Sequence, residues 1–378
     1  MTHALLGEAL LAITAIYPLV AIAALRSRRY RSRIERSDEA PVPVTVLKPL
    51  CGAEPRLYEN LRSFCEQDIE DYQIVFGARH AGDPALAIAR RLQSELPYRD
   101  ISIVCDERVH GSNLKVSNLM NLLPRARHET LVIADSDMRV PPDYLRRVTA
   151  PLAKPGVGLV TCLYRGQAVC GFWSRLGALF VNEWFAPSVN VASLFGPTFF
   201  AFGATLALRR STLDALGGLP AIVDQLADDY RLGQLTREFG RRIVLSDCDV
   251  TSDVVESSLR DLVAHELRWL RTIRAVQPFG YFGLGVTFTL PVAAIGCALA
   301  GLGLFSASLA AIAIATRALL HWQTTRGHVT NIGMIMLRDC LSLVLWTLAL
   351  NTRRVNWRGQ TLTISADGSA LLAPGTAP

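Results

Sequence analysis

Residues 130–137 read Thr130-Leu131-Val132-Ile133-Ala134-Asp135-Ser136-Asp137, an apolar run that ends in two carboxylates. A short, continuous apolar run rich in β-branched residues predicts a strand buried on both faces. Because side chains alternate along a strand, Asp135 and Asp137 point the same way just beyond it. Two carboxylates there can bind a hard divalent cation through oxygen. The same spacing is common in solvated turns, so the position directly after a buried strand is what favours a metal site.

Three similar runs precede this stretch, separated by helical patterns: the runs cover residues 44–47, 72–76 and 101–104, and the helical patterns cover residues 84–96 and 116–123. Alternation of apolar strands with helices predicts a parallel sheet covered on both faces. Ligands of such sheets collect at the carboxyl ends of the strands. We therefore expect an α/β domain over residues 41–275, with Asp135 and Asp137 at its binding edge.

Apolar sequence is concentrated near the two ends of the chain. Half of the 378 residues are hydrophobic, and the mean hydropathy of +0.26 is too high for a purely soluble protein of this size. Residues 4–25 are long enough to span a bilayer as a helix. Arginines follow this block rather than precede it: Arg26, Arg28, Arg29, Arg31, Arg33 and Arg36. This order predicts an uncleaved anchor over residues 1–25, with the chain beyond it in the cytoplasm.

The C-terminal apolar sequence predicts further membrane segments over residues 279–350. Residues 279–322 carry one charge, Arg317, and can form two spans with a turn near residues 301–303. The next apolar block contains Arg338 and Asp339 side by side, which is costly inside a membrane and favours a re-entrant or interfacial helix. The tail, residues 361–378, is predicted to be disordered.

Charge and cysteine content exclude several functions. The net charge of +6 resides largely in the arginine cluster beside the first apolar block, where it suits anionic lipid headgroups better than nucleic acid. The 8 cysteines include no C-x-x-C pair, so we expect reduced, buried thiols rather than a zinc site or a disulfide framework. No Walker motif is present, which disfavours a nucleotide hydrolase.

A second acidic pair, Asp228-Asp229, opens a predicted helix. Displacing the leaving group of a sugar needs a carboxylate that accepts the proton of the acceptor hydroxyl. Exposed acids are also favoured in a first helical turn by the helix dipole alone, and the pair by itself favours that simpler interpretation.

Two basic segments suit a phosphate. Residues 265–269 read His-Glu-Leu-Arg-Trp, in which Arg268 can bind phosphate through two hydrogen bonds and Trp269 can stack on a ring or line a lipid channel. The alternative is a basic amphipathic helix on the membrane surface. The loop Gly111–Asn118 leads into a helix and offers backbone amides together with Lys115.

The order of these motifs resembles the inverting glycosyltransferases of the ceramide glucosyltransferase family, from the N-terminal anchor to residues 356–359. The segments that carry the resemblance are Lys48-Pro49 with Glu54-Pro55, Asp83-Pro84, Asn113–Asn118, Asp135-Ser136, Asp228-Asp229-Tyr230 and Arg268-Trp269. Each is weak alone, and their order and spacing carry the assignment. It implies a GT-A-like fold, a Rossmann-type mixed sheet, with N- and C-terminal transmembrane helices.

Residues 111–119 and 201–205 look most like a bacterial branch of these enzymes, the hopanoid biosynthesis-associated glycosyltransferases. This narrower resemblance implies transfer of N-acetylglucosamine from its UDP donor to the lipid bacteriohopanetetrol. The alternatives are the same chemistry with UDP-glucose and ceramide, a polyisoprenyl-phosphate glycosyltransferase, and a non-catalytic membrane scaffold.

The resemblance also implies roles for individual residues. Asp229 would be the catalytic base with Asp228 beside it, and Asp135, with Asp137 nearby, would bind Mg²⁺ or Mn²⁺ on the diphosphate. The remaining donor-binding residues would be Lys48, Pro49, Asp83 at the uridine, Lys115, His265, Arg268 and Trp269. Two positions depart from the pattern: His265 replaces the usual glutamine, and ceramide-using members often have glycine in place of Asp137. Candidate walls of an acceptor pocket are Phe172, Trp173, Phe180, Trp184 and Phe185, for which core packing is the alternative.

Overall fold

The structure is a computed structural model that describes residues 2–34, 42–301, 303–325, 332–357, 360–365 and 368–372. One half of it is built on an eight-stranded sheet of order β3-β2-β1-β4-β7-β6-β8-β5. The strands are β1 (Val44–Pro49), β2 (Tyr72–Ala78), β3 (Asp100–Cys105), β4 (Thr130–Ile133), β5 (Met138–Arg139), β6 (Val157–Ala168), β7 (Leu206–Arg209) and β8 (Arg242–Val254).

The four predicted strands form one parallel half of the sheet, in which β2 and β4 flank β1. The other half is mixed: β7 is antiparallel to both β4 and β6, whereas β6 and β8 run parallel. The predicted α/β fold with a mixed sheet is therefore confirmed, with β6 and β8 as long strands that the sequence analysis did not identify.

Successive side chains of the central strands point alternately into two hydrophobic cores, one on each face of the sheet. Val46 and Val132 point into the core on one face, and Leu47 and Ile133 point into the core on the other. The covering helices are α2 (Leu57–Cys65), α3 (Pro84–Glu95), α4 (Leu114–Leu122), α5 (Tyr144–Thr149), α8 (Arg210–Ala215) and α9 (Asp228–Glu238). Burial of both faces explains why these strands read as continuous apolar runs.

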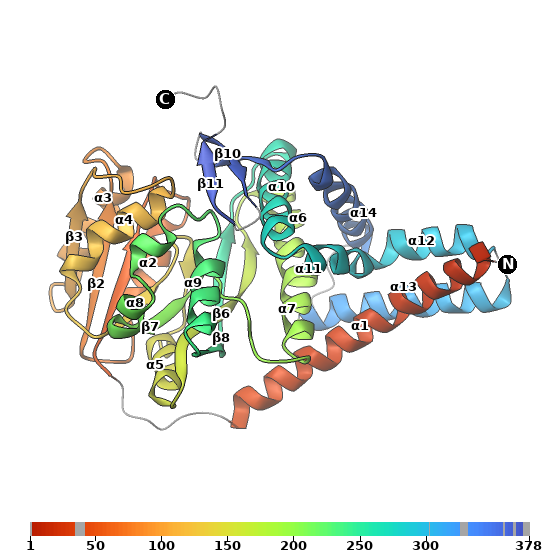
Figure 1. Cartoon of the computed structure of the whole chain (residues 1–378), viewed down its shortest axis with the longest axis horizontal. Coiled ribbons are helices and arrows are strands. Elements are labelled where there is room, and N and C mark those ends of the chain that lie inside the picture. The colour runs from red at the N-terminus through yellow and green to blue at the C-terminus, as the bar shows by residue number, and fades with distance from the viewer. Residues whose placement is uncertain are drawn as a thin grey trace.

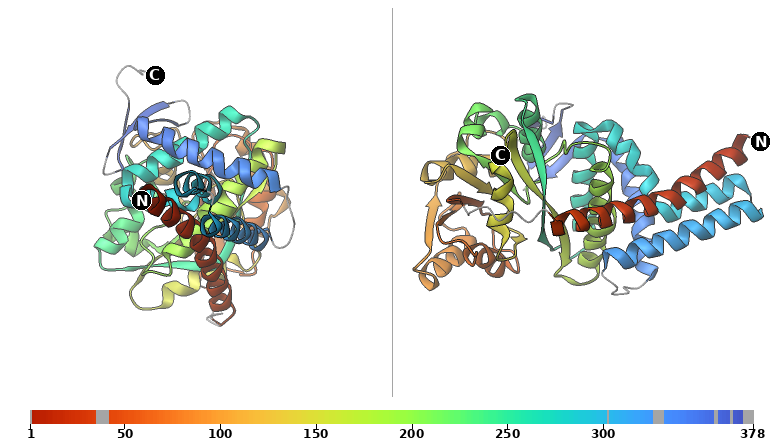
Figure 2. Two further views of the ribbon diagram at one scale, coloured as in Figure 1. Left: turned by 90° about the vertical axis from the view of Figure 1, so that its right-hand side faces the viewer. Right: turned by 90° about the horizontal axis from the view of Figure 1, so that it is seen from below.

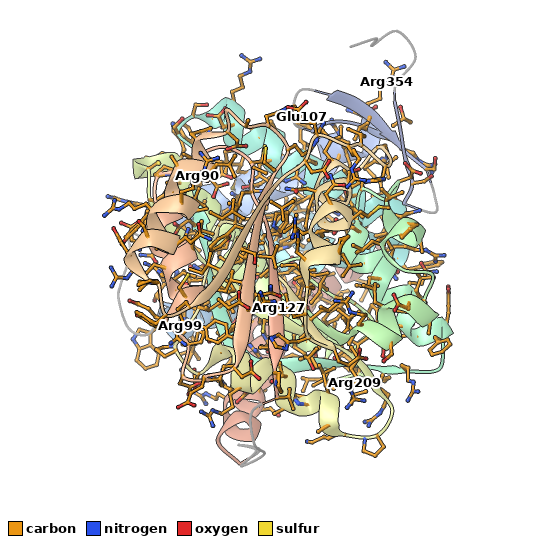
Figure 3. All side chains as sticks on the ribbon, turned by 90° about the vertical axis from the view of Figure 1, so that its left-hand side faces the viewer. Arg90, Arg99, Glu107, Arg127, Arg209 and Arg354 are labelled. Carbon is orange, nitrogen blue, oxygen red and sulfur yellow. The ribbon has the colours of Figure 1, made fainter. Side chains whose placement is uncertain are left out.

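The carboxyl ends of the parallel strands share one edge of the molecule. Figure 3 looks at the β3 side of the sheet: Arg99, just before β3, lies low in the view, and Glu107, just after it, lies at the top. Arg354, from the C-terminal part of the chain, lies at the same upper edge as Glu107. The C-terminal sheet therefore approaches the edge where ligands of a parallel sheet are expected.

A second half of the molecule consists of long apolar helices. The helices α1 (Thr2–Ile34), α12 (Thr289–Ala300) and α13 (Leu304–Thr324) run side by side away from the sheet, with the N-terminus at the far end (Figures 1 and 2). Gly7 allows close contact between α1 and α12, since a Cβ atom there would lie 2.4 Å from the backbone nitrogen of Ala300. Small residues at such crossings are typical of membrane helices.

Three of the described helices are long and apolar enough to cross a membrane: Thr2–Arg28, Leu304–Thr324 and Gly333–Asn351. A fourth candidate is a pair bent by 74°, Pro278–Thr287 with Thr289–Ala300. The bent pair includes α11 (Pro278–Gly283). The turn predicted near residues 301–303 separates α12 from α13.

The helix α14 (Ile332–Leu348) runs across the bundle rather than along it (Figure 1). Before it, the carbonyl of Thr324 accepts a hydrogen bond from Arg165 of β6; after it, the carbonyl of Thr352 accepts one from Arg274. These bonds hold the end of α13 to β6 and the segment that follows α14 to α10. The re-entrant or interfacial placement predicted for this block stays a prediction.

The charged residues expected to be costly in the apolar helices are buried and paired. Arg317 of α13 binds Asp339 of α14 and Glu183, at 2.8 Å in each case, and His321 also contacts Glu183. Arg338 pairs separately with Glu266. We call Glu183, Arg317, His321 and Asp339 the membrane-side ion network. Full pairing removes the penalty that an isolated buried charge would carry.

One of the arginines after the first apolar block pairs within the protein. Helix α1 continues to Ile34, and Arg28 pairs with Asp249 of β8 at 2.7 Å. The attraction of this cluster to lipid headgroups stays a prediction. The side chains of residues 29–36 lie outside the described part of the chain.

The tail is not disordered where it is described, and that part of the prediction is wrong. The strands β9 (Arg354–Trp357), β10 (Gln360–Ile364) and β11 (Ala370–Leu372) form a small antiparallel sheet. Leu362 and Ile364 bury their side chains against Leu226 and Ala275, which the local sequence does not reveal. Residues 366–367 and 373–378 lie outside the described residues.

Candidate functional site

The structure brings the two predicted acidic pairs together. Asp135 follows β4, Asp228 and Asp229 begin α9, and Lys115 of α4 lies between them. The ammonium of Lys115 is 2.8 Å from Asp135 Oδ1 and 3.2 Å from Asp228 Oδ2. Burial disfavours its charged form, but the neighbouring aspartates outweigh burial and raise the pKa of Lys115. The lysine thus stays charged beside the acids, as a phosphate-binding residue needs to.

Gly203 is the residue that holds this cluster together, and the sequence analysis assigned it no role. Its N–H donates to Asp229 Oδ2 at 2.7 Å, and its carbonyl accepts from the N–H of Asp135 at 3.3 Å. A Cβ atom at this position would lie 2.8 Å from Asp135 Oδ2 and 3.0 Å from Lys115 Nζ. A side chain at this position would therefore displace the carboxylate of Asp135 or the ammonium of Lys115. The sequence signal that could have identified Gly203 is its place in the segment 201–205.

The two adjacent aspartates differ in their surroundings. Asp228 is 6 % exposed, accepts a hydrogen bond from Asn113 and pairs with Lys115. Asp229 is half-buried and accepts only backbone N–H groups, from Gly203 and Tyr230. Burial, followed by the charge of Asp228, raises the pKa of Asp229 to about 6. A carboxylate with a raised pKa is the better proton acceptor, which favours Asp229 over Asp228 as a base.

Asp137 lies deeper than Asp135. Its Oδ2 accepts a hydrogen bond from Ser252 at 2.9 Å. Burial, together with the negative charges of Asp135 and Glu54, raises the pKa of Asp137 to about 7. Burial also lowers the pKa of Lys48 to about 7, although these acids favour its charged form. The edge of the sheet therefore carries more carboxylates than its lysines neutralise.

This surplus of carboxylates fits a divalent cation. No group of three or more metal-binding side chains occurs among the described residues, so protein ligands alone do not complete a site. Mg²⁺ is commonly held by one or two carboxylates plus the phosphates of a substrate. Asp135 is the accessible carboxylate of the pair, with its side chain 34 % exposed. Asp137, half-buried and bonded to Ser252, is placed to assist rather than to bind alone.

Two predicted donor-binding residues shape the backbone around this edge. Asp83 caps α3 by accepting the N–H of Ala85, and it also accepts the N–H of Gly52. It thereby ties α3 to the loop that follows β1. Pro49 ends β1 directly before that loop, in register with Gly77 of β2. Both lie where a nucleotide could bind, and their contact with uridine stays a prediction.

The third predicted motif lies on α10 (Leu259–Val276), which packs beside α6 (Gly171–Phe180) and the π-helical turn η3 (Val181–Phe185). His265 contacts Glu256, and its ring packs edge-on against Trp269, 5.3 Å away. Glu256 is a partner that the sequence analysis did not identify.

Tyr164 of β6 connects α10 to the acidic cluster. Its ring meets Trp269 edge-on at 6.2 Å. Burial first, then the charge of Asp229, raises the pKa of Tyr164, whereas Arg268 opposes the shift. The phenol therefore lies within the electrostatic influence of both the candidate base and the candidate diphosphate-binding arginine. Tyr164 was missed because it occurs within an apolar strand.

The five aromatic residues predicted as acceptor walls divide into two groups. Phe180 and Phe185 pack against Trp269, with ring centroids 5.9 and 5.7 Å away, and Trp184 stacks on Phe180 at 4.4 Å. Phe172 and Trp173 instead pack on each other. The first group lies beside the candidate site, at the end of α6 and in η3, which precedes α7 (Ala186–Ala192).

A mixed α/β sheet with an acidic cluster at its carboxyl edge and a basic-aromatic helix beside it is a GT-A-like glycosyltransferase fold. The model of glycosyl transferase family 21 matches residues 9–370. The match covers nearly the whole sequence, so this chain belongs to glycosyl transferase family 21.

Among curated proteins, ceramide glucosyltransferase 1 of Caenorhabditis elegans is 24% identical over 262 residues, which cover 69% of this chain and 56% of that protein. Ceramide glucosyltransferase 3 of the same organism is 23% identical over 265 residues, which cover 69% and 57%. This chain spans little more than half the length of these relatives.

Among solved structures, the chain is similar to the mannosyltransferase PcManGT from Pyrobaculum calidifontis in complex with GDP-Man and Mn²⁺. The TM-score is 0.48 and the identity 22%, covering 90% of this chain and 98% of that one. It is also similar to S. aureus TarS 1-349 in complex with UDP-GlcNAc, with a TM-score of 0.41, 13% identity and coverage of 89% and 98%.

Proposed function

We propose that this protein transfers a sugar from a UDP-sugar to the hydroxyl of a membrane lipid, with inversion at the anomeric carbon. The observation that carries this proposal is the half-buried Asp229, whose pKa is raised to about 6 beside the Lys115–Asp135 pair. A carboxylate base next to a cluster suited to a cation and a diphosphate is what a direct displacement requires. The long apolar helices attached to this domain support a lipid acceptor.

In this mechanism, Asp229 accepts the proton of the acceptor hydroxyl as that oxygen attacks the sugar. The two backbone N–H groups bound to Asp229 fix the orientation of its carboxylate. Lys115 and Arg268 would bind the diphosphate. A divalent cation bound at Asp135 would stabilise the negative charge of the leaving diphosphate.

We assign the acceptor to bacteriohopanetetrol and the sugar to N-acetylglucosamine on the basis of the segments 111–119 and 201–205. The second candidate is transfer of glucose to ceramide, which the similarity to the two ceramide glucosyltransferases favours. The decisive test is mass spectrometry of products after offering the purified protein each lipid with each UDP-sugar. A glycosylated product supports the proposal and identifies the pair, whereas no product from any combination contradicts it.

We place the catalytic domain in the cytoplasm of a bacterium, where nucleotide sugars are made. The arginines that follow the first apolar block support this orientation. A reporter fused after Arg36 should therefore give a cytoplasmic signal. A periplasmic signal would contradict both the topology and the assignment of the donor.

A further inference from the structure

The helix that crosses the membrane bundle is joined to the helix that carries Arg268 and Trp269 by one buried ion pair. Arg338 of α14 donates through both Nη atoms to the two carboxylate oxygens of Glu266 of α10, at 2.7 Å each. Arg338 is 1 % exposed and Glu266 is 3 % exposed. A two-bond arginine–carboxylate contact fixes the relative orientation of its partners as well as their separation.

The surroundings of Arg338 show that its position is determined by several contacts. Its Nε donates to Ser342 at 3.1 Å, and one Nη also donates to the carbonyl of Leu176 of α6 at 3.3 Å. Its guanidinium lies 5.3 Å from the centre of the Phe180 ring. One side chain of α14 thus contacts both α10 and α6, the two helices that contribute aromatic residues near the candidate site.

Glu266 lies on the opposite side of α10 from the donor-binding arginine. Successive residues of an α-helix are rotated by about 100°, so Glu266 and Arg268 are separated by about 200°. By the same rotation Trp269 lies about 60° from Glu266, and its ring meets Tyr164 of β6. The ion pair therefore holds the turn of α10 from which Arg268 and Trp269 project in different directions. The last turn of α10 is held separately, by hydrogen bonds from Arg274 to the carbonyls of Leu350 and Thr352.

We infer that Arg338 is a positioning residue: by binding Glu266 it sets the rotation of α10 that presents Arg268 and Trp269 to the UDP moiety of the donor. This inference rests on the proposed function. It assigns to the C-terminal apolar helix a role in donor binding, in addition to any role in membrane attachment.

The test compares UDP affinity, measured by calorimetry on the full chain in lipid nanodiscs, with stability and acceptor kinetics. Removing one partner alone strands a buried charge, whereas replacing both with apolar residues of similar volume is often tolerated. The informative variant is therefore the double substitution Arg338→Met with Glu266→Met. We expect its Kd for UDP to rise about tenfold, the effect of losing one good charged hydrogen bond, while the KM for the lipid changes less than about twofold.

A matched control is available in the membrane-side ion network. The double substitution Arg317→Met with Asp339→Met removes an equally buried pair from α13 and α14 and leaves Glu183 with His321. Because this pair does not contact α10, its removal should leave UDP affinity unchanged. Equal losses of affinity in both double variants would show a general structural effect and overturn the inference.

The conservative substitution Arg338→Lys keeps the charge but loses the planar two-bond geometry. We expect it to weaken UDP binding to an intermediate extent, and this variant decides the question if the Met double variant does not fold. UDP affinity equal to that of the unmodified protein, in either variant, overturns the inference. If the unmodified protein itself neither binds UDP nor transfers sugar, the proposed function fails instead, and the two failures are distinguishable.

Discussion

Two groups of buried charge in this molecule have opposite character. The acidic cluster at the carboxyl edge of the sheet comprises Asp135, Asp137, Asp228 and Asp229 with Lys115. The membrane-side ion network lies about the helices α13 and α14. Both contain carboxylates that are partly or wholly removed from water, yet only in the acidic cluster do the acids clearly outnumber the cations.

The ratio of acids to cations distinguishes the acidic cluster, a candidate functional site, from the membrane-side ion network, which has a structural role. In the network, Arg317 contacts both Glu183 and Asp339, and His321 contacts Glu183 as a second basic partner. In the acidic cluster, burial and like charge raise the pKa of Asp229 to about 6 and of Asp137 to about 7. Carboxylates without enough positive charge nearby are a mark of function, because a bound cation or a transferred proton would neutralise the excess negative charge. Carboxylates that are paired with cations instead specify how helices pack.

The largest expected effect is that of Asp229→Asn, which keeps the size of the side chain and removes the proton acceptor. Turnover should fall by about 10² to 10⁴, while the calorimetric Kd for the UDP-sugar should change little, because a base acts in the transition state. Asp228→Asn is the matched control and should be milder, since Asp228 is committed to Lys115 and Asn113. A dead Asp228→Asn with an active Asp229→Asn would move the base by one residue; near-normal turnover of both would remove the base from this site.

The next effect concerns the divalent cation. Loss of a group that stabilises leaving-group charge costs about 10² to 10³ in rate, so Asp135→Ala should be nearly inactive. A chelator should stop turnover of the unmodified protein, and Mg²⁺ or Mn²⁺ should restore it. Full activity in excess chelator would exclude the metal role of Asp135.

In the membrane-side ion network the main expected effect is on stability. Arg317→Met leaves Glu183 and Asp339 without their shared arginine and should destabilise the fold by about 3–5 kcal/mol. The additional substitution Asp339→Met should restore most of this loss, as followed by the apparent melting temperature in nanodiscs. Turnover per folded molecule should stay within about twofold, and a large specific loss of turnover would place the network in the catalytic machinery.

The smallest effect is a shift in pH dependence. The base must be ionised, so kcat/KM should rise as the pH increases through about 6, the pKa of Asp229. Asp228→Asn removes a neighbouring negative charge and should therefore lower the pKa of Asp229. The rising limb of the pH profile of kcat/KM should then move to lower pH. A limb that stays in place, or moves to higher pH, would show that another group controls it.

Comparison of sequence and structure shows where local pattern is sufficient. The strands β1 to β4 were predicted because burial on both faces produces continuous apolar runs, and Asp135 was found because it follows one of them. Gly203 and Tyr164 were not found, since each gains its role from residues distant in sequence. The tail was wrongly predicted to be disordered for the same reason. Leu362 packs against Leu226 and Ala275, and both of these residues are distant from it in sequence.

Apolar periodicity and the order of motifs are local properties of the chain, and they were enough to identify the α/β class, the apolar helices at both ends, and Asp135, Asp229 and Arg268 as candidates. The pairing of charges is visible only in the folded chain: Lys115 bridges Asp135 and Asp228, and Arg338 and Asp339 of one apolar helix pair with Glu266 and Arg317. The free energy of a buried charge depends on its partners in space, which the positions of residues along the chain do not specify.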